Sequence, residues 1–286
     1  MRLSADQLEQ YYTLGYVVIP CPFPADLTQD CLRAVEKVVK DAKANSGDTM
    51  KNHFRLTSQI EGSYWSALDH SLPFLQIELH AEVIEIARQL IGEQDIYFRN
   101  GGINELAPGR GFLWHRDVEN DGVENEYTEF MHYFSGADES SGCLRVVPGS
   151  QKGKIDELKA EVAARRAARG DEGRAEMEGP ADVALDGEVS LELGPGNLLV
   201  RSSRIYHATW KNESAAGRLM HHWLFRGPEA NNHRFRFDEY LSDELVAGLS
   251  EEQRQVLWLG REFEIDPTYA AERERELGRV RWSTVF

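Results

Sequence analysis

Apolar residues in the N-terminal part of the chain recur mostly with helical spacing. Ser4 can cap a helix over residues 5–13 that ends at Gly15, and the apolar run 16–19 then predicts a strand. From Asp26 to about residue 43 apolar positions recur every three or four residues, and a second such helix ends at Gly92. The pattern predicts a mainly helical support over residues 1–94.

After residue 95 the helical spacing gives way to short β-type runs separated by Gly, Pro, Asn and Asp. The runs cover residues 95–105, 111–118, 127–134, 143–147, 189–193, 197–201, 205–210 and 218–226. Many short strands with turn residues between them are typical of a sandwich or jelly roll, and not of alternating βαβ units. We therefore expect a mainly β core over residues 95–226.

Two further segments flank or interrupt this core. Residues 150–187 are rich in Ala, Arg, Glu and Lys but poor in apolar residues, which predicts an inserted helix or mobile flap. A lid over the site and a merely solvated insertion are both open. Apolar residues after position 240 predict packing helices within a C-terminal segment, 227–286. Together the segments predict one domain, 1–286.

Composition narrows the functional classes. With 48 acidic and 32 basic residues the net charge is −16, which disfavours binding to nucleic acid or to an anionic membrane. The three cysteines are an odd number without a C-x-x-C pair, and no apolar run approaches the roughly 18 residues that span a bilayer. We expect a cytoplasmic protein, either monomeric or homodimeric.

The segment GFLWHRD carries candidate metal chemistry. If it is extended, the two-residue period places His115 and Asp117 on one face, and His207 on a distant run can complete a three-ligand set. Two histidines and one carboxylate form the facial triad of non-haem iron oxygenases, which leaves positions open for a cosubstrate and O2. An isolated H-x-D pattern is weak, because it often arises by chance.

The residues around His207 strengthen this hypothesis. Arg218 follows His207 by eleven positions and opens the run RLMHHWLFR, so that its guanidinium could hold a carboxylate in a bidentate fork. Thr209 shares a face with His207 and could donate its hydroxyl to the same carboxylate. Pro-Gly turns end the run 142–150 and precede the strand 197–201.

The ordered set of W-H-x-D, G-x-L-x-V-x-P-G-S, P-G-N-L-L-V and H-x-T, with an arginine eleven positions after the histidine, resembles the phytanoyl-CoA dioxygenase family. That family includes ectoine hydroxylase, and the opening GYVVIP is similar too. The resemblance spans about residues 95–226. It implies a double-stranded β-helix, a cupin-like jelly roll with Fe(II) between its two sheets. Halogenating relatives have a small residue in place of Asp117, so halogenation is disfavoured.

The resemblance also implies roles for single residues. His115, Asp117 and His207 would bind iron, and Arg218 and Thr209 would hold the far carboxylate of 2-oxoglutarate. Weaker candidates for contacting cosubstrate or substrate are Asn100 and Asn104. Candidates for the substrate pocket, each with a packing role as the alternative, are Trp114, His132, Tyr133 and His222. Arginines near the predicted strands, at positions 99, 110, 116, 201 and 204, could contact an anionic substrate or lie exposed.

The predicted function is an Fe(II)- and 2-oxoglutarate-dependent dioxygenase. It would use O2 to hydroxylate an unactivated C–H bond of a small polar metabolite, with release of succinate and CO2. The same site could perform desaturation or ring formation. The alternatives are a metal dioxygenase without a cosubstrate and a non-catalytic cupin-like protein that binds a metal or small ligand. The primary substrate is not identified by the sequence.

Overall fold

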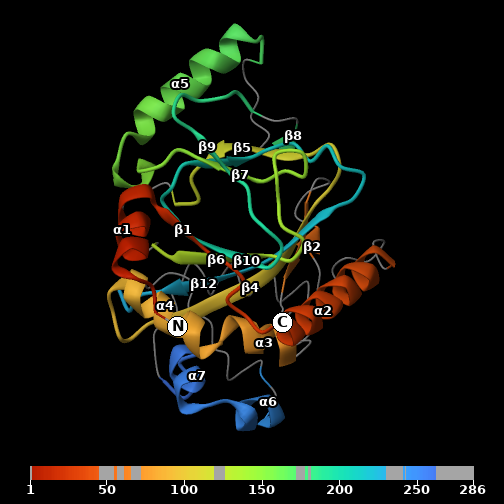
Figure 1. Ribbon diagram of the computed structural model, residues 1–286, viewed down its shortest axis with the longest axis vertical. Helices are drawn as coiled ribbons and strands as arrows, with labels where there is room; N and C mark the ends of the chain where they lie inside the picture. The colour runs from red at the N-terminus through yellow and green to blue at the C-terminus, as the bar shows by residue number, and fades with distance from the viewer. Residues whose placement is uncertain are drawn as a thin grey trace, which may run out of the picture.

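Two antiparallel sheets face each other in the computed structural model, which describes residues 2–44, 55–56, 61–65, 72–118, 126–171, 178–179, 182–229, 241 and 243–261 (Figure 1). The major sheet has the order β1 (Tyr16–Ile19), β10 (Asn197–Ser202), β6 (Thr128–Tyr133), β12 (Arg218–Arg226), β4 (Tyr97–Leu106), β3 (Glu61–Trp65) and β2 (Arg55–Leu56). The minor sheet has the order β8 (Glu178–Gly179), β5 (Gly111–His115), β11 (His207–Thr209), β7 (Leu144–Val146) and β9 (Val189–Leu191). This architecture is the predicted jelly roll.

Helices cover the outer face of the major sheet. They are α1 (Ala5–Leu14), α2 (Ala25–Ala44), α3 (Leu72–Glu78), α4 (Ala81–Ile91), α6 (Asp243–Gly248) and α7 (Glu251–Val256). Ser4 and Gln7 form a capping box at the start of α1, and Gly15 ends it in the left-handed conformation, as the sequence predicts. Among the helices described, none is both long and apolar enough to cross a bilayer.

Three apolar clusters lie between these layers. The first packs the helices against the major sheet through residues such as Val35, Ile84 and Phe130. The second fills the space between the sheets, with Leu144, Leu199 and others. Because strand side chains alternate between faces, strands β1, β10, β6 and β12 of the major sheet contribute to both clusters. The site described below occupies the remaining space between the sheets.

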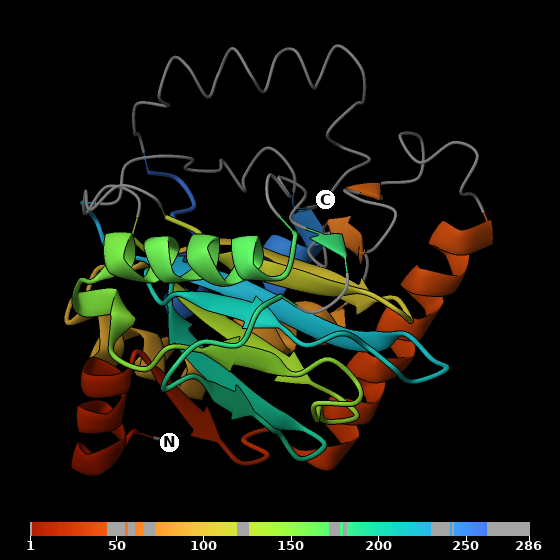
Figure 2. The ribbon, with the colours of Figure 1, turned by 90° about the horizontal axis from the view of Figure 1, so that it is seen from above.

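The third cluster settles the position of the inserted helix α5 (Ile155–Ala168). Leu158 and Val162 of α5 pack against Trp114 and Tyr206, on the face of the minor sheet that points away from the major sheet. Figures 1 and 2 show α5 along this outer side. The helix within 150–187 is thus confirmed, but α5 is neither a lid nor merely solvated.

Some expectations for the N-terminal segment were incomplete. The strand pair β2–β3 extends the major sheet by pairing β3 with β4, and α3 precedes α4. Neither was predicted, because Glu61–Trp65 is polar and short and acquires its strand conformation from pairing with a distant strand. The predicted C-terminal helices are confirmed for α6 and α7, and the tail after residue 261 lies outside the described residues.

Candidate metal centre

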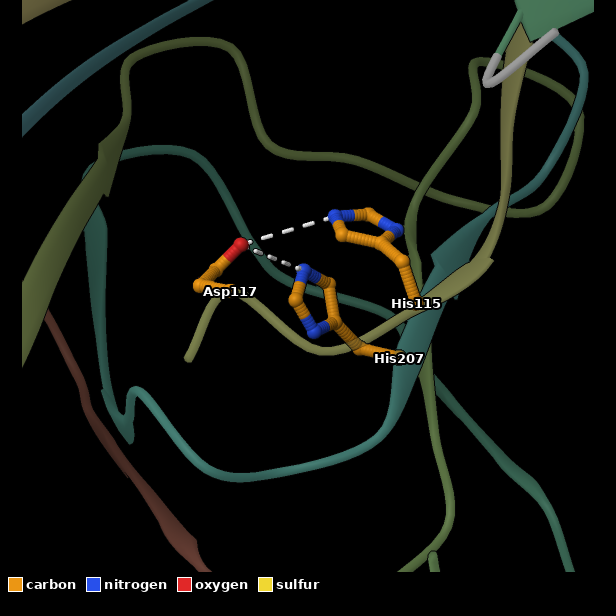
Figure 3. Close-up of side chains that lie close together, drawn as sticks. All are labelled: His115, Asp117 and His207. Atoms are coloured by element: carbon orange, nitrogen blue, oxygen red, sulfur yellow. Dashed lines mark ion pairs between the residues drawn. The ribbon is translucent and has the colours of Figure 1, made fainter. Parts of the chain in front are cut away.

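Three side chains from two segments converge between the sheets. His115 is the last residue of β5, Asp117 lies in the bend just after it, and His207 opens β11 opposite His115. Asp117 Oδ1 lies 3.5 Å from Nε2 of His115 and 3.7 Å from Nε2 of His207. Figure 3 shows the carboxylate facing both rings. The sequence placed Asp117 inside a strand; the strand ends earlier, yet the side chains still meet.

The histidine tautomers suit metal binding. Nδ1 of His115 lies 2.7 Å from the carbonyl oxygen of Leu113, and Nδ1 of His207 lies 3.0 Å from that of Ile205. A carbonyl oxygen accepts a hydrogen bond, so the proton of each neutral ring is held at Nδ1. The lone pair of each Nε2 is therefore directed at the space beside Asp117. In metal-binding histidines a hydrogen bond from the other ring nitrogen fixes the ring in the same way.

The electrostatics of Asp117 and His207 favour the protonation states that bind a metal. Burial would raise the pKa of Asp117, but the Arg201 guanidinium and both histidines outweigh it and hold the pKa well below its usual range. Burial lowers the pKa of His207 well below its usual value, and Arg201 and His115 add to this effect. An ionised carboxylate and a neutral imidazole are the forms that bind a metal.

A divalent ion fits this donor set. The three residues each offer one ligand atom, and these three atoms lie within 4.8 Å of one another. An ion roughly 2 Å from each donor can bridge such separations with small side-chain movements. Two imidazoles and one carboxylate leave coordination positions open, as in the facial triad of non-haem iron proteins. The structure thus brings the three predicted ligands together.

Asp117 is held by a chain of buried charges. Its Oδ2 accepts a hydrogen bond from Nη2 of Arg201 at 2.7 Å, and Arg201 also pairs with Glu129, its cross-strand neighbour. The other carboxylate oxygen of Glu129 lies 2.9 Å from Nδ1 of His222. A Cβ at position 102 would lie 2.8 Å from Nε2 of His222, so glycine at this position makes room for that ring. The network links the carboxylate of the centre to strands β6, β10 and β12.

The triad opens into a cavity of about 280 Å³ between the sheets. Arg218 and Thr209 both line it, and the Arg218 guanidinium lies over the Tyr133 ring at 5.1 Å. Arg218 is only 7% exposed, and its Nε has no hydrogen-bond partner within the described part of the chain. A buried cationic donor without a partner fits an anionic ligand beside Arg218.

Some of the remaining predicted pocket residues lie on the cavity face of their strand, and others lie on the opposite face. Asn104, Tyr133 and His222 line the cavity. His132 points to the opposite face, where it packs between Phe23 and Phe134, because it neighbours the cavity residue Tyr133 in a strand.

Trp114 likewise faces away from its neighbour His115. Its ring stacks on Tyr206, and its Nε1 donates to the carbonyl oxygen of Val183 at 2.8 Å. Neither Trp114 nor His132 lines the cavity as the described residues bound it, so the structure does not support their placement in the pocket. The side chain of Asn100 lies outside the described residues.

Two residues of the site went unrecognised in the sequence. Arg201 was weighed only as one of several arginines with surface exposure as the alternative, and Glu129 was not considered. Both are buried, with relative exposures of 4% and 6%. The available signal was a single charge in each of the otherwise apolar runs NLLVR and TEFMHY. Their pairing could not be recognised without knowing that β10 and β6 are neighbours.

Comparison with known families agrees with this geometry. A family model described as phytanoyl-CoA dioxygenase (PhyH) matches residues 11–220, which include the three triad residues and Arg218. The chain belongs to the PhyH family. The predicted membership is thereby confirmed. No curated protein matches the PhyH-family chain at a significant level.

Solved structures share the fold at low sequence identity. The structure of EctD from S. alaskensis with 2-oxoglutarate and 5-hydroxyectoine has a TM-score of 0.58 and 20% identity, over 80% of this chain and 78% of that one. The carbocyclase SnoK from nogalamycin biosynthesis has a TM-score of 0.58 and 18% identity, over 87% and 91%. The epimerase SnoN, in complex with Fe3+, alpha ketoglutarate and nogalamycin RO, has a TM-score of 0.56 and 13% identity, over 77% and 82%.

Proposed function

We propose that this PhyH-family chain is an Fe(II)- and 2-oxoglutarate-dependent dioxygenase. It would hydroxylate an unactivated C–H bond of a small polar metabolite, consuming O2 and releasing succinate and CO2. The observation that carries the proposal is the occurrence of a His-Asp-His donor set and a buried arginine without an acidic partner among the described residues, both lining one cavity. A metal centre alone does not need such a cation beside it.

Each group has a part in this proposal. Nε2 of His115 and of His207 and Oδ1 of Asp117 would hold iron, which when bound supplies the O2-activating chemistry. Arg218 would neutralise the far carboxylate of 2-oxoglutarate, with Thr209, which also lines the cavity, as a hydroxyl donor. Asn104, on the cavity face of β4, would contact cosubstrate or substrate. Arg201 keeps the Asp117 carboxylate ionised and fixes its orientation.

The small cavity supports a small substrate. Cosubstrate and the reacting part of the substrate must share about 280 Å³, which is at the low end of typical ligand pockets. His222 and Tyr133 line the same cavity and would contact the substrate or cosubstrate. Hydroxylation is proposed because it needs only one C–H bond beside the iron. The solved carbocyclase and epimerase of this fold make ring formation and epimerisation the alternatives.

A non-catalytic ligand-binding protein is the rival from another class. The buried Arg218 Nε, which has no hydrogen-bond partner among the described residues, favours a site built for a dianionic cosubstrate over a simple metal store.

We also propose that residues 1–286 act as one domain in the cytoplasm. The helices pack on the major sheet through one contiguous apolar cluster, and all three cysteines are free thiols, which supports both statements.

The decisive experiment compares the wild type with Asp117→Ala. Anaerobic addition of Fe(II) and 2-oxoglutarate should give the wild type a weak visible charge-transfer band, and aerobic screening of metabolites should reveal coupled succinate release. Asp117→Ala should lose both, whereas Asp186→Asn, a change at a side chain that is 91% exposed, should keep both. Wild-type absorbance and succinate release in Asp117→Ala would refute the assignment of this centre.

A further inference from the structure

A β-bulge distinguishes strand β4 at Arg99. In the pairing of β12 with β4, Leu224 is opposite Asn100 but the next residue, Phe225, is opposite Phe98. Arg99 is therefore the extra residue on β4. Bulges of this kind change the direction of a side chain and are common beside active sites. The bulge lies near the start of β4, a strand that contributes Arg99 and Asn104 to the cavity wall.

The bulge changes which face Arg99 occupies. After the bulge along β4, Gly102 and Asn104 face the cavity and Ile103 packs in the outer apolar cluster. Strict alternation would place even-numbered residues in the cavity and Arg99 among the helices. Instead Phe98 is fully buried in the outer cluster, and Arg99 lines the cavity. Without the bulge a guanidinium would be forced into an apolar layer.

Among the described residues that line the cavity, Arg99 is the one arginine to which the proposed chemistry assigns no anion. Arg201 is paired with Asp117 and Glu129, and Arg218 is assigned to 2-oxoglutarate. Arg99 has no carboxylate within ion-pair distance in the described part of the chain, and its buried Nε has no hydrogen-bond partner there. The charges of Fe(II) and 2-oxoglutarate cancel, so the loaded cavity retains the positive charge of Arg99.

A second cation, Arg226, lies close enough to Arg99 for the two charges to interact. Arg226 lies over the Tyr127 ring at 5.5 Å, and the Tyr127 side chain forms part of the cavity wall. Burial, followed by the charge of Arg99, lowers the pKa of Arg226 to about 10. Two guanidinium groups thus repel each other beside Tyr127. Holding like charges together is unfavourable, and an anionic group bound at Arg99 would reduce this repulsion.

We propose that Arg99 binds an anionic group of the primary substrate, and that the substrate is a small carboxylate. The planar guanidinium matches a carboxylate in a bidentate arrangement, and the Tyr127 hydroxyl is the nearby neutral donor. Arg218 and Arg99 would then divide the cavity between them, one for the cosubstrate and one for the substrate. This inference rests on the proposed function, because it assigns Arg218 to 2-oxoglutarate.

The consequence for specificity is a charge requirement. A substrate without an anionic group would leave the Arg99 guanidinium buried against the substrate and unpaired, which is costly. An uncharged amide of the same size should therefore bind much more weakly than the acid. A cationic metabolite should not bind in this orientation.

Acetate, with acetamide as its uncharged control, tests the site directly. Each is titrated into protein loaded with Fe(II) and saturating 2-oxoglutarate under nitrogen, and binding is read from saturation transfer to the methyl protons. Acetate should give transfer and acetamide should not. Arg99→Gln should weaken acetate binding by at least about tenfold, Arg99→Lys should bind between the wild type and Arg99→Gln because it keeps the charge but not the bidentate fork, and Arg110→Gln, a charge-matched change outside the cavity, should leave binding unchanged.

Equal acetate binding in the wild type and Arg99→Gln would overturn the proposal, because acetate would then bind at the iron or elsewhere. Absence of acetate binding in the wild type would overturn it as well. The visible charge-transfer band is recorded on the same samples. A band in every variant with unchanged acetate binding means that only the inference about Arg99 fails. Loss of the band in the wild type means that the proposed function fails, while saturation transfer still decides the anion site.

Discussion

Arg201 provides a demanding test of the electrostatic argument. Its guanidinium lies between two carboxylates, those of Asp117 and Glu129, and its side chain is 5% exposed. The Glu129 side chain is 7% exposed and that of Asp117 is 21% exposed. Arg201→Met keeps the length and apolar stem of the side chain but removes the cation. Both carboxylates then remain in a poorly hydrated space without it.

The expected magnitude follows from the burial of the cluster. Removing one member of a buried ion pair costs about 3–5 kcal/mol, whereas an exposed pair contributes roughly 0–1 kcal/mol. We therefore expect Arg201→Met to lower the free energy of unfolding by about 3–5 kcal/mol. Glu129→Gln should cost less, because Arg201 keeps Asp117 as a partner. Asp186→Asn, which removes the exposed partner of Arg165, should cost less than about 1 kcal/mol.

The double variant Arg201→Met/Glu129→Gln isolates the interaction. It carries one unpaired carboxylate instead of two, so its stability should exceed the additive expectation by about 1–3 kcal/mol. Urea unfolding of metal-free protein at pH 7, followed by tryptophan fluorescence, gives the four free energies without a contribution from bound iron. Additive single effects, or a loss below about 1 kcal/mol in Arg201→Met, would refute the claim that Arg201 compensates two buried charges.

Three further predictions address the cosubstrate end, the outer core and the inserted helix. Arg218→Ala should raise the KM for 2-oxoglutarate at least about 100-fold in a succinate assay, because a buried charge-assisted contact is lost; an increase below tenfold would mean that another cation holds the cosubstrate. Burial lowers the pKa of His132 to about 4, against its usual 6.5, so its neutral folded form loses stability as pH falls through that interval. The free energy of unfolding of His132→Phe minus that of the wild type, measured with urea, should therefore be about 2 kcal/mol larger at pH 5 than at pH 7. The KM should be unchanged, and an altered KM would place His132 in the pocket. Val162→Ala should cost about 2 kcal/mol because it leaves a cavity beside Trp114, while kcat and KM stay constant; a kinetic change without loss of stability would instead indicate a lid.

The sequence alone determined the features that depend on local spacing. Short β-type runs separated by Gly and Pro turns predicted a sandwich or jelly roll, and a two-residue period placed His115 and Asp117 near one point. The ordered motifs supplied the family, which brought the distant His207 and Arg218 into one hypothesis. These features were accessible because each is written within a few neighbouring residues or within a known motif order.

Only the tertiary structure decided how the strands pair. The Arg201–Glu129 contact depends on β10 lying beside β6 in one register, and the direction of Arg99 depends on one extra residue in β4. A shift of one residue moves a strand side chain to the other face, so spacing within the sequence cannot show which charges meet. For the same reason the sequence could not show that His132 lies in the outer core and not in the pocket. Local pattern thus predicted the metal ligands, whereas the partners of the buried charges were set by long-range pairing.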